Sequence, residues 1–335
     1  MSEYQYYEFL AIDRPLSGAD RDALRQLSTR ARITATSFTN FYEWGDFKGD
    51  PAKLMARFFD LHLYLANWGS RRLMIRLPAR LIDRRRLDAF LREADDVTVR
   101  TAGENLILNI FGEEVETDGD EDGSGWLAAL SPLRADVLSG DLRLFYLLWL
   151  RAVEADLLEP DELEPLPGIG PLTGPLTAFA EFFDLDRDLV AAAAERAAEP
   201  PLRTPASSAA PQRIAAARSV GELRGRAEEI GRERERVQAQ KAAAEQKRRE
   251  HEAARLRRTR LDGIARRGES VWREIETEIE RRNAAGYDKA AGLLLDLQAI
   301  AEEEGEAKSF ARRLQTIRER HAHKKRFIER VMQIG

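Results

Sequence analysis

The pattern of apolar and polar positions divides the chain into four stretches of different texture. Residues 1–112 mix short alternating runs with helical apolar spacing, and residues 124–198 keep only the helical spacing. Residues 215–265 are almost entirely polar and charged, and residues 266–335 again carry apolar residues three and four positions apart. Because strands repeat every two residues and helices every 3.6, these textures predict an α+β region followed by an all-α region.

The first stretch predicts a small α+β domain spanning residues 1–112. The alternating runs predict strands at 4–12, 31–38, 72–78, 96–100 and 106–111. Helical spacing and N-cap residues predict helices starting at Ser17 and Asp50, the second reaching residue 65, and a third helix at 81–91. Strands interleaved with helices favour a mostly antiparallel sheet with helices on one face, and we expect a ferredoxin-like arrangement.

The second stretch, residues 124–198, predicts a separate helical domain. Its apolar residues fall at helical spacing in the ranges 126–138, 141–157, 176–183 and 186–198. Residues 199–214 are rich in proline, alanine and serine, which predicts a flexible linker.

The third stretch, residues 215–265, predicts one long charged helix, which the pattern extends over 220–267. Its interior consists of Arg, Glu, Gln, Lys and Ala, which are strong helix formers. Leu223, Ile230 and Val237 recur seven residues apart, but a stable coiled coil needs two apolar positions in every heptad. We therefore expect either a weak coiled coil or a solvated single helix that connects the parts on either side.

The last stretch, residues 266–335, predicts a three-helix bundle. Three apolar stripes occur at helical spacing, over 264–279, 287–300 and 310–331. Gly286 and Gly305 separate them.

Composition narrows the class of protein. The chain has no cysteine, which excludes disulfides, thiolate catalysis and thiolate-bound metals. The start of the chain shows no signal-peptide pattern and no apolar run is long enough to span a bilayer, so we expect a cytoplasmic protein. The net charge of −5 hides an asymmetry, since acidic residues dominate before residue 210 and basic residues after it. A basic arm on an acidic body indicates either a polyanion partner or contact between the halves.

The loop expected at 39–50 is the candidate small-ligand site. It interleaves aromatic and polar side chains that can stack on a flat ligand and hydrogen-bond to its edge. The candidate residues are Asn40, Tyr42, Trp44, Asp46 and Lys48. The alternative is that the aromatic side chains anchor this connection to the core, while the acidic residues serve a turn and a helix cap.

Basic clusters in the last third of the chain are the candidate nucleic-acid interface. The candidate residues are Arg255, Arg257, Arg258, Arg260, Lys324, Lys325 and Arg326. Clustered Lys and Arg suffice for phosphate binding, so the signal has low specificity. The alternative is a solvated helix face in which glutamates offset the basic residues.

Other motifs give no enzyme or metal signature. Residues 118–123 match the front of an EF-hand loop, but the twelfth position is Ala129, where that loop needs a bidentate glutamate. His62 is expected in the core, and His321 and His323 point to different sides of a helix, so they do not chelate together. We therefore predict no catalytic residues, no metal site and no cofactor.

Three local runs resemble a family of uncharacterised bacterial proteins. They are S-E-Y-Q-Y-Y-E-F at 2–9, W-G-D-F-K-G-D at 44–50 and R-H-A-H-K-K at 320–325. The resemblance runs along most of the chain, and it implies no activity, so no functional residues carry over from it. From the residues themselves, the leading interpretation is a non-enzymatic protein-interaction or scaffold protein. A nucleic-acid-associated accessory protein is the alternative, and a small-ligand or enzymatic site at 39–50 is the third.

Overall fold

The computed structural model describes residues 3–45, 47–91, 96–115, 122–196 and 217–334. The chain divides into two compact units, Met1–Glu235 and Arg236–Gly335, called unit 1 and unit 2 below. Helix α9 (Val220–Arg267) begins in the first unit and ends in the second. None of the described helices is long and apolar enough to cross a membrane.

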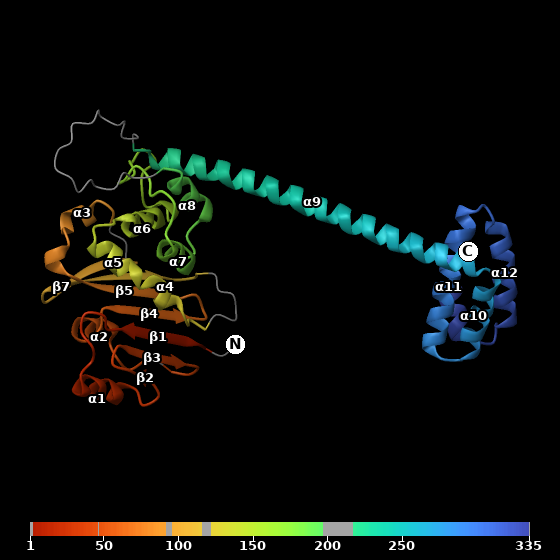
Figure 1. Ribbon diagram of the computed structural model, residues 1–335, viewed down its shortest axis with the longest axis horizontal. Coiled ribbons are helices and arrows are strands. Elements are labelled where there is room, and N and C mark those ends of the chain that lie inside the picture. Colours follow the sequence, from red (N-terminus) through yellow and green to blue (C-terminus); the bar gives the residue numbers. More distant parts are fainter. Residues whose placement is uncertain (1–2, 46, 92–95, 116–121, 197–216, 335) are drawn as a thin grey trace. The chain divides into compact units, whose positions relative to one another are not determined.

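Unit 1 is built on a seven-stranded sheet (Figure 1). Its strands are β1 (Gln5–Leu10), β2 (Arg32–Ile33), β3 (Ser37–Tyr42), β4 (Leu61–Ala66), β5 (Arg71–Pro78), β6 (Val97–Ala102) and β7 (Asn105–Gly112). The strands lie in the order β2-β3-β1-β4-β5-β7-β6, and every neighbouring pair is antiparallel. The predicted α+β class is therefore confirmed. The strand order differs from a ferredoxin-like arrangement, because that fold needs parallel strands joined by crossover helices.

Two predicted element boundaries in unit 1 were wrong. The helix expected from Asp50 to residue 65 is short, since α2 (Pro51–Arg57) ends early and β4 follows it. Strand β4 lies between β1 and β5 with both faces covered, so its apolar run cannot be told from a buried helix by periodicity. The single strand expected at 31–38 is two strands, and β3 continues into the loop that was expected at 39–50.

Five helices cover one face of the sheet (Figure 1). They are α4 (Trp126–Leu130), α5 (Pro132–Leu138), α6 (Arg143–Glu154), α7 (Gly174–Phe182) and α8 (Arg187–Ala194). Their buried side chains join one hydrophobic cluster with Leu63 of β4, Ile75 of β5 and Leu108 of β7. The regions 1–112 and 124–198, which the sequence suggests as separate domains, thus share a hydrophobic cluster.

The opposite face of the sheet carries a smaller cluster. It contains Phe9 of β1, Phe38 of β3 and Met55 of α2, together with Leu24 of α1 (Gly18–Leu27). A short 3-10 helix (Ala79–Leu81) and α3 (Arg84–Asp88) complete the elements of the sheet region.

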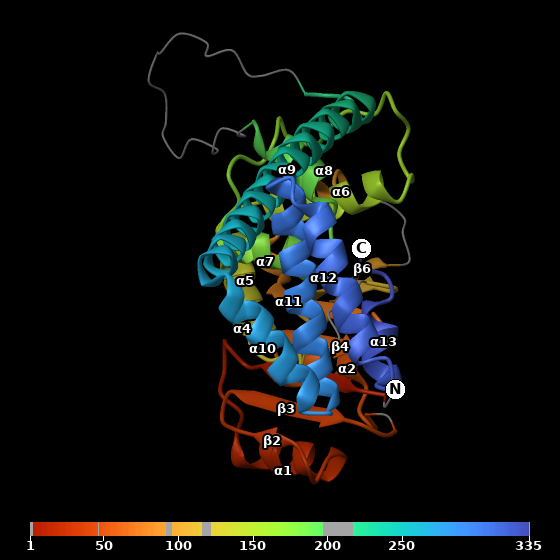
Figure 2. The same cartoon turned by 90° about the vertical axis from the view of Figure 1, so that its right-hand side faces the viewer.

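Unit 2 is helical, and its helices pack side by side (Figure 2). After α9 come α10 (Glu269–Glu280), α11 (Ala284–Glu303), α12 (Ala307–Arg320) and α13 (Lys325–Val331). Their hydrophobic cluster includes Ile275, Leu294 and Phe327, and it also takes in Ile264 from the end of α9. The third helix of the predicted bundle is thus two helices, because the chain turns between His321 and Lys324.

Candidate functional site

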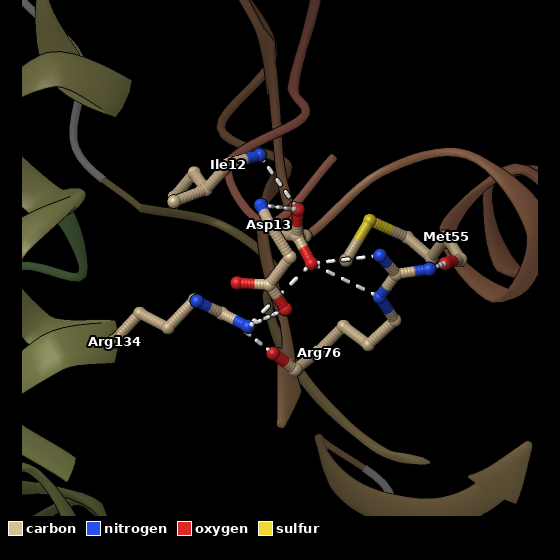
Figure 3. Close-up of polar contacts among 6 residues, drawn as sticks. Ile12, Asp13, Met55, Arg76 and Arg134 are labelled. Carbon is tan, nitrogen blue, oxygen red and sulfur yellow. Dashed lines mark hydrogen bonds and ion pairs between the residues drawn. The ribbon is translucent and has the colours of Figure 1, made fainter. Parts of the chain in front are cut away.

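A buried carboxylate, that of Asp60, ties the start of β4 to the segment that follows β1 (Figure 3). Its Oδ2 accepts hydrogen bonds from the backbone N–H groups of Ile12 at 2.6 Å and Asp13 at 2.9 Å. Its Oδ1 accepts hydrogen bonds from Arg76, at 3.1 Å from Nε and 2.8 Å from Nη2. Four accepted bonds fill the hydrogen-bonding capacity of a carboxylate, so this group stabilises the fold and has no acceptor site left for a ligand.

Arg134 of α5 extends this network to the helical layer (Figure 3). Its Nη2 donates to Asp13 Oδ2 at 2.6 Å, and its Nε donates to the Arg76 carbonyl at 2.8 Å. Burial alone would raise the pKa of Asp60, but the N–H groups of Asp13 and Ile12 and the Arg76 guanidinium together lower it. The network therefore stabilises the ionised carboxylate of Asp60, and it joins two layers of unit 1.

A second buried network holds the segment that leads into α9. Arg218 donates to both carboxylate oxygens of Glu164, from Nε at 3.1 Å and from Nη2 at 3.0 Å. The Tyr146 hydroxyl donates to Glu164 Oε2 at 2.5 Å, and Arg218 Nη1 donates to the Ala192 carbonyl at 2.7 Å. Tyr146 lies in α6 and Ala192 in α8, so this network joins four segments of unit 1, including those that hold Glu164 and Arg218.

The first turn of α9 is capped directly after this ion pair. The Ser219 Oγ accepts a hydrogen bond from the Glu222 N–H, and the Glu222 carboxylate accepts one from the Ser219 N–H. This reciprocal pair is a capping box, which satisfies backbone donors at a helix start. Val220 and Leu223 are buried in the cluster of unit 1, so the start of α9 is packed as well as capped.

His62 lies in the core, as the sequence predicts, but on β4 and not on a helix. Its Nδ1 lies 3.0 Å from the Glu8 carbonyl, which can only accept, so Nδ1 carries the proton. The ring stacks on Phe9 with 3.9 Å between centroids. Complete burial lowers the pKa of His62 to about 3, so the ring is neutral near pH 7. It belongs to the core.

Of the predicted ligand residues of 39–50, Asn40 and Tyr42 are hydrogen-bonded to each other. Asn40 is buried in β3, where its Nδ2 donates to Ser28 Oγ at 2.9 Å and to the Tyr42 hydroxyl at 2.7 Å. Trp44 and Lys48 are exposed to solvent, and Asp46 lies outside the described residues. The Asn40 amide therefore forms hydrogen bonds inside unit 1.

The alternative interpretation of this loop, anchoring by an aromatic side chain, fits the structure better. Phe47 is buried, and its ring centroid lies 5.1 Å from that of Tyr7 and 5.7 Å from that of Phe38. The Asp50 carboxylate caps α2 by accepting hydrogen bonds from the N–H groups of Ala52 and Lys53.

An exposed aromatic surface remains at the end of β3. Phe41 is 58% exposed, and Trp44 is 81% exposed three residues further on. The Phe41 ring stacks on Tyr4 with 6.3 Å between centroids. Burial and the carboxylates of Asp122 and Glu43 raise the pKa of Tyr4, which indicates that acidic groups border this surface. Aromatic side chains are enriched at protein–protein interfaces relative to the rest of a protein surface.

The predicted nucleic-acid residues fall into two groups in unit 2. Arg258 pairs with Glu303 at 2.5 Å and Arg260 with Asp296 at 2.6 Å, both acids of α11. Lys324 is buried and pairs with Glu280 at 2.6 Å.

The other four candidates are exposed, and within the described residues none of them forms an ion pair. They are Arg255, Arg257, Lys325 and Arg326. The acids of unit 2 thus neutralise part of the predicted basic surface.

The EF-hand-like run lies mostly outside the described residues, which resume at Asp122. The Asp122 Oδ1 accepts hydrogen bonds from the N–H and hydroxyl of Ser124, at 2.9 and 2.6 Å, which makes a turn. Among the residues that the structure describes, no group of three or more His, Asp or Glu side chains is arranged to hold a metal ion.

Each unit has an open cavity with charged walls. In unit 1 a cavity of about 510 Å³ lies between the end of α6, the start of α8 and the first turns of α9. Charged residues of its walls form ion pairs with each other, such as that between Arg234 and Asp188 at 2.7 Å. In unit 2 a cavity of about 390 Å³ is lined by Trp272 and Phe310, and the Arg313 guanidinium lies 4.3 Å from the Trp272 ring centroid.

The buried networks were missed at the sequence level. Asp60 and Arg76 are 16 residues apart, whereas Glu164 and Arg218 are 54 apart, and no local spacing signals such pairs. One usable hint is Arg134, a charge within the apolar helical run at 126–138. Comparison with models of protein families, with curated proteins and with solved structures finds no match for the chain.

Proposed function

We propose that the chain is a non-enzymatic adaptor for protein interactions, in which α9 connects two units with separate hydrophobic clusters. The observation that carries this proposal is that α9 is packed near both of its ends and exposed between them. Its first turns pack in the cluster of unit 1 and Ile264 near its end packs in that of unit 2. Every residue from 235 to 260 is exposed.

The exposed turns of α9 suit a connector and not a core element. A buried helix needs an apolar stripe, and these turns carry charged side chains all round. Pairs four residues apart, such as Glu245 with Arg249 at 2.6 Å, support a helix in water. We propose that α9 works as a solvated single helix. The alternative, a weak coiled coil, predicts a dimer whose amount rises with protein concentration.

The exposed aromatic surface at Phe41 and Trp44 is the proposed docking site for a protein partner. Aromatic side chains supply much of the binding free energy at protein interfaces, because they bury a large area with few rotatable bonds. The bordering carboxylates of Glu43 and Asp122 favour a partner with basic groups around an apolar centre.

A capture experiment with the full-length chain tests the adaptor proposal. The tagged chain is incubated with an extract of its source cells, with and without nuclease, and retained proteins are compared. Phe41→Ser with Trp44→Ser should abolish retention of a nuclease-resistant partner. Leu256→Ser, which changes an exposed apolar side chain of α9, is the matched control and should retain it. Equal retention by both variants, or no retention after nuclease, contradicts the proposal.

Nucleic-acid binding is the second candidate function. The observation that favours it is the exposure of Arg255, Arg257, Lys325 and Arg326, none of which has a carboxylate partner among the described residues. A small-ligand role for 39–50 has less support, since the side chain of Asn40 is committed to the interior. We also propose a cytoplasmic location, and membership of the bacterial family that the three sequence runs resemble.

A further inference from the structure

The cavity of unit 2 has the size of a small-molecule site. Its volume is about 390 Å³, and residues of α10, α11, α12 and the last turn of α9 line it. Cavities that hold small ligands in proteins measure about 300–1,000 Å³. The lining residues all lie between positions 264 and 313, so the cavity belongs to unit 2 alone.

Apolar side chains from three helices line this cavity. Phe310 of α12 is buried, whereas Trp272 of α10 and Leu297 and Ile300 of α11 are only partly buried. The ring centroids of Trp272 and Phe310 lie 6.0 Å apart. Because covering exposed apolar surface is favourable in water, these walls suit a ligand with an apolar body.

The charged side chains that line the cavity are mostly acidic. They are Glu269, Glu304, Glu306 and Arg313. Arg313 is already paired, because its two terminal nitrogens donate to the two carboxylate oxygens of Glu269. The carboxylates of Glu304 and Glu306 therefore remain as the uncompensated charges of the cavity.

Glu304 and Glu306 flank Gly305 in the turn between α11 and α12. Both side chains are exposed, and neither forms an ion pair or a side-chain hydrogen bond within the described residues. Glu306 is the N-cap residue of α12, yet its carboxylate accepts no hydrogen bond from that helix. Two carboxylates in one short turn make the local electrostatic potential negative, which attracts a cation.

The two acids that precede this turn show the contrast. Glu302 Oε1 accepts a hydrogen bond from Gln298 Nε2 at 2.9 Å, and Glu303 pairs with Arg258 at 2.5 Å. Neither Glu302 nor Glu303 lines the cavity. In the run 302–306, the acids outside the cavity thus have partners in the fold, whereas those at the cavity have none in the part of the chain that the structure describes.

We infer that this cavity binds a small organic cation, an amine that carries an aromatic or aliphatic body. The body contacts Trp272, Ile300 and Phe310, and the ammonium group lies at the acidic turn 304–306. A cation is compatible with the aromatic wall, since ring faces attract positive charge and the Arg313 guanidinium already lies 4.3 Å from the Trp272 ring centroid. An anionic ligand of the same shape is disfavoured, because it would meet the same two carboxylates.

Nuclear magnetic resonance of the full-length chain with isotope-labelled tryptophan tests the inference. Trp272 is the only tryptophan of unit 2, and Trp272→Phe identifies its indole N–H signal. The probes are phenethylamine, phenethyl alcohol and hydrocinnamate, which share an apolar body and differ in charge. Phenethylamine should shift the Trp272 signal and saturate with a Kd of about 1 mM, an affinity that a ligand of this size can reach. The alcohol should bind about tenfold more weakly, the typical effect of one charge-assisted contact, and hydrocinnamate more weakly still.

Substitutions at exposed positions locate the binding site. Glu304→Gln with Glu306→Gln removes both free carboxylates, so phenethylamine should bind about tenfold more weakly, no better than the alcohol. Glu302→Gln with Glu303→Gln removes the same charge from the same helix end outside the cavity, and this matched control should keep the wild-type affinity. Ala265→Phe leaves the charge unchanged and places a large side chain at an exposed lining position, so it should abolish the binding of phenethylamine.

The inference fails if phenethylamine at tens of millimolar gives no saturable shift of the Trp272 signal, or if hydrocinnamate binds equally well. It also fails if the two double variants lose affinity equally, which would report only the overall charge of unit 2, or if Ala265→Phe still binds phenethylamine. Since the substituted side chains are exposed, circular dichroism and the remaining tryptophan signals should match the wild type, which excludes failed folding. The adaptor proposal is tested through Phe41 and Trp44 of unit 1, so either proposal can fail without the other.

Discussion

Unit 1 contains buried ion pairs that bridge distant segments, whereas in unit 2 most of the bridging charges lie at the surface. The carboxylates of Asp60 and Glu164 are completely inaccessible, and each is bonded to an arginine. In unit 2 the Arg258–Glu303 pair has side chains 63% and 52% exposed. Other helix-bridging pairs of unit 2 are also partly exposed, as in Arg313–Glu269.

The difference predicts how each unit responds when a charge is removed. A buried ion loses its hydration, so breaking its pair leaves a charge with neither water nor partner. An exposed ion regains water when its partner is removed, and the median surface pair contributes about 0–1 kcal/mol. Unit 1 should therefore be sensitive to single charge changes, whereas unit 2 should depend mainly on the apolar side chains between its helices.

The largest expected effect is that of Glu164→Gln. The substitution leaves the Arg218 guanidinium buried without a counter-charge, so the free energy of unfolding of unit 1 should fall by about 3–5 kcal/mol. Urea unfolding followed by tryptophan fluorescence measures the loss, since Trp149 is buried beside Tyr146.

The double variant Glu164→Met with Arg218→Met is the control for that measurement. It removes both charges, and apolar replacement of a buried pair is often close to neutral. It should therefore be more stable than the single variant. A double variant less stable than Glu164→Gln would show that the ion pair itself stabilises unit 1 strongly.

Acid should weaken unit 1 at a higher pH than unit 2. The pKa of His62 is about 3 in the fold against 6.5 ordinarily, so the unfolded state takes up its proton first. Stability is complete above pH 6.5 and falls as the pH drops toward 3, by at most about 1.4 kcal/mol per pH unit. Asp60, with a lowered pKa, adds a loss only below its ordinary value of 3.8.

In unit 2 the carboxylates with lowered pKa lose their contribution to stability at a lower pH than His62 does in unit 1. Lys289 lowers the pKa of Glu274 and of Glu278, and Lys324 lowers that of Glu280, so their contribution is lost only below their ordinary value of 4.5. Hydrogen exchange read separately for peptides of each unit at pH 6.5, 5.5 and 4.5 measures the difference. His62→Met should flatten the response of unit 1 over this range, and an unchanged slope would rule out His62 as its cause.

The fold was predictable where local chemistry decides it. Helix α9 was expected over 220–267 and is Val220–Arg267, because its strong helix formers dictate a helix without tertiary help. Strand β4 was not predictable, since its leucines suit a helix equally well. Its hydrogen bonds to β1 and β5 decide the structure, and those partners are distant in sequence.

The candidate sites were predictable only as residue types. Composition drew attention to Trp44 and to Arg255, and both are exposed. It gave no means to separate Arg257 from Arg258, although an acid of α11 neutralises the second.

Removing the surface pairs of unit 2 should have a small effect. Arg258→Gln with Arg260→Gln breaks the ion pairs with Glu303 and Asp296, so the free energy of unfolding of unit 2 should fall by about 1 kcal/mol in total. High salt should remove most of this difference, because ions screen exposed charges. Hydrogen exchange in α11 peptides at low and high salt measures it. A loss of several kcal/mol would show that these pairs stabilise unit 2 as strongly as buried pairs stabilise unit 1.

The smallest expected effect on stability is that of Arg255→Gln with Arg257→Gln, because neither arginine has a carboxylate partner within the described residues. This variant tests nucleic-acid binding, with Arg258→Gln and Arg260→Gln as the charge-matched control. Under the adaptor proposal we expect the full-length chain to bind duplex DNA more weakly than micromolar at physiological salt, since glutamates alternate with arginines along α9.

The nucleic-acid alternative predicts a different pattern from the same variants. Binding of arginine to phosphate releases condensed counterions, so affinity should fall steeply with salt, and the slope should flatten by about one unit for each phosphate-binding arginine that is replaced. Fluorescence anisotropy with labelled duplex DNA across a salt series measures the slope. Micromolar binding that Arg255→Gln with Arg257→Gln abolishes, but the control variant keeps, would place nucleic acid ahead of protein as the partner. An equal decrease in affinity in both variants would instead indicate attraction to the overall charge of unit 2, without a specific interface on α9.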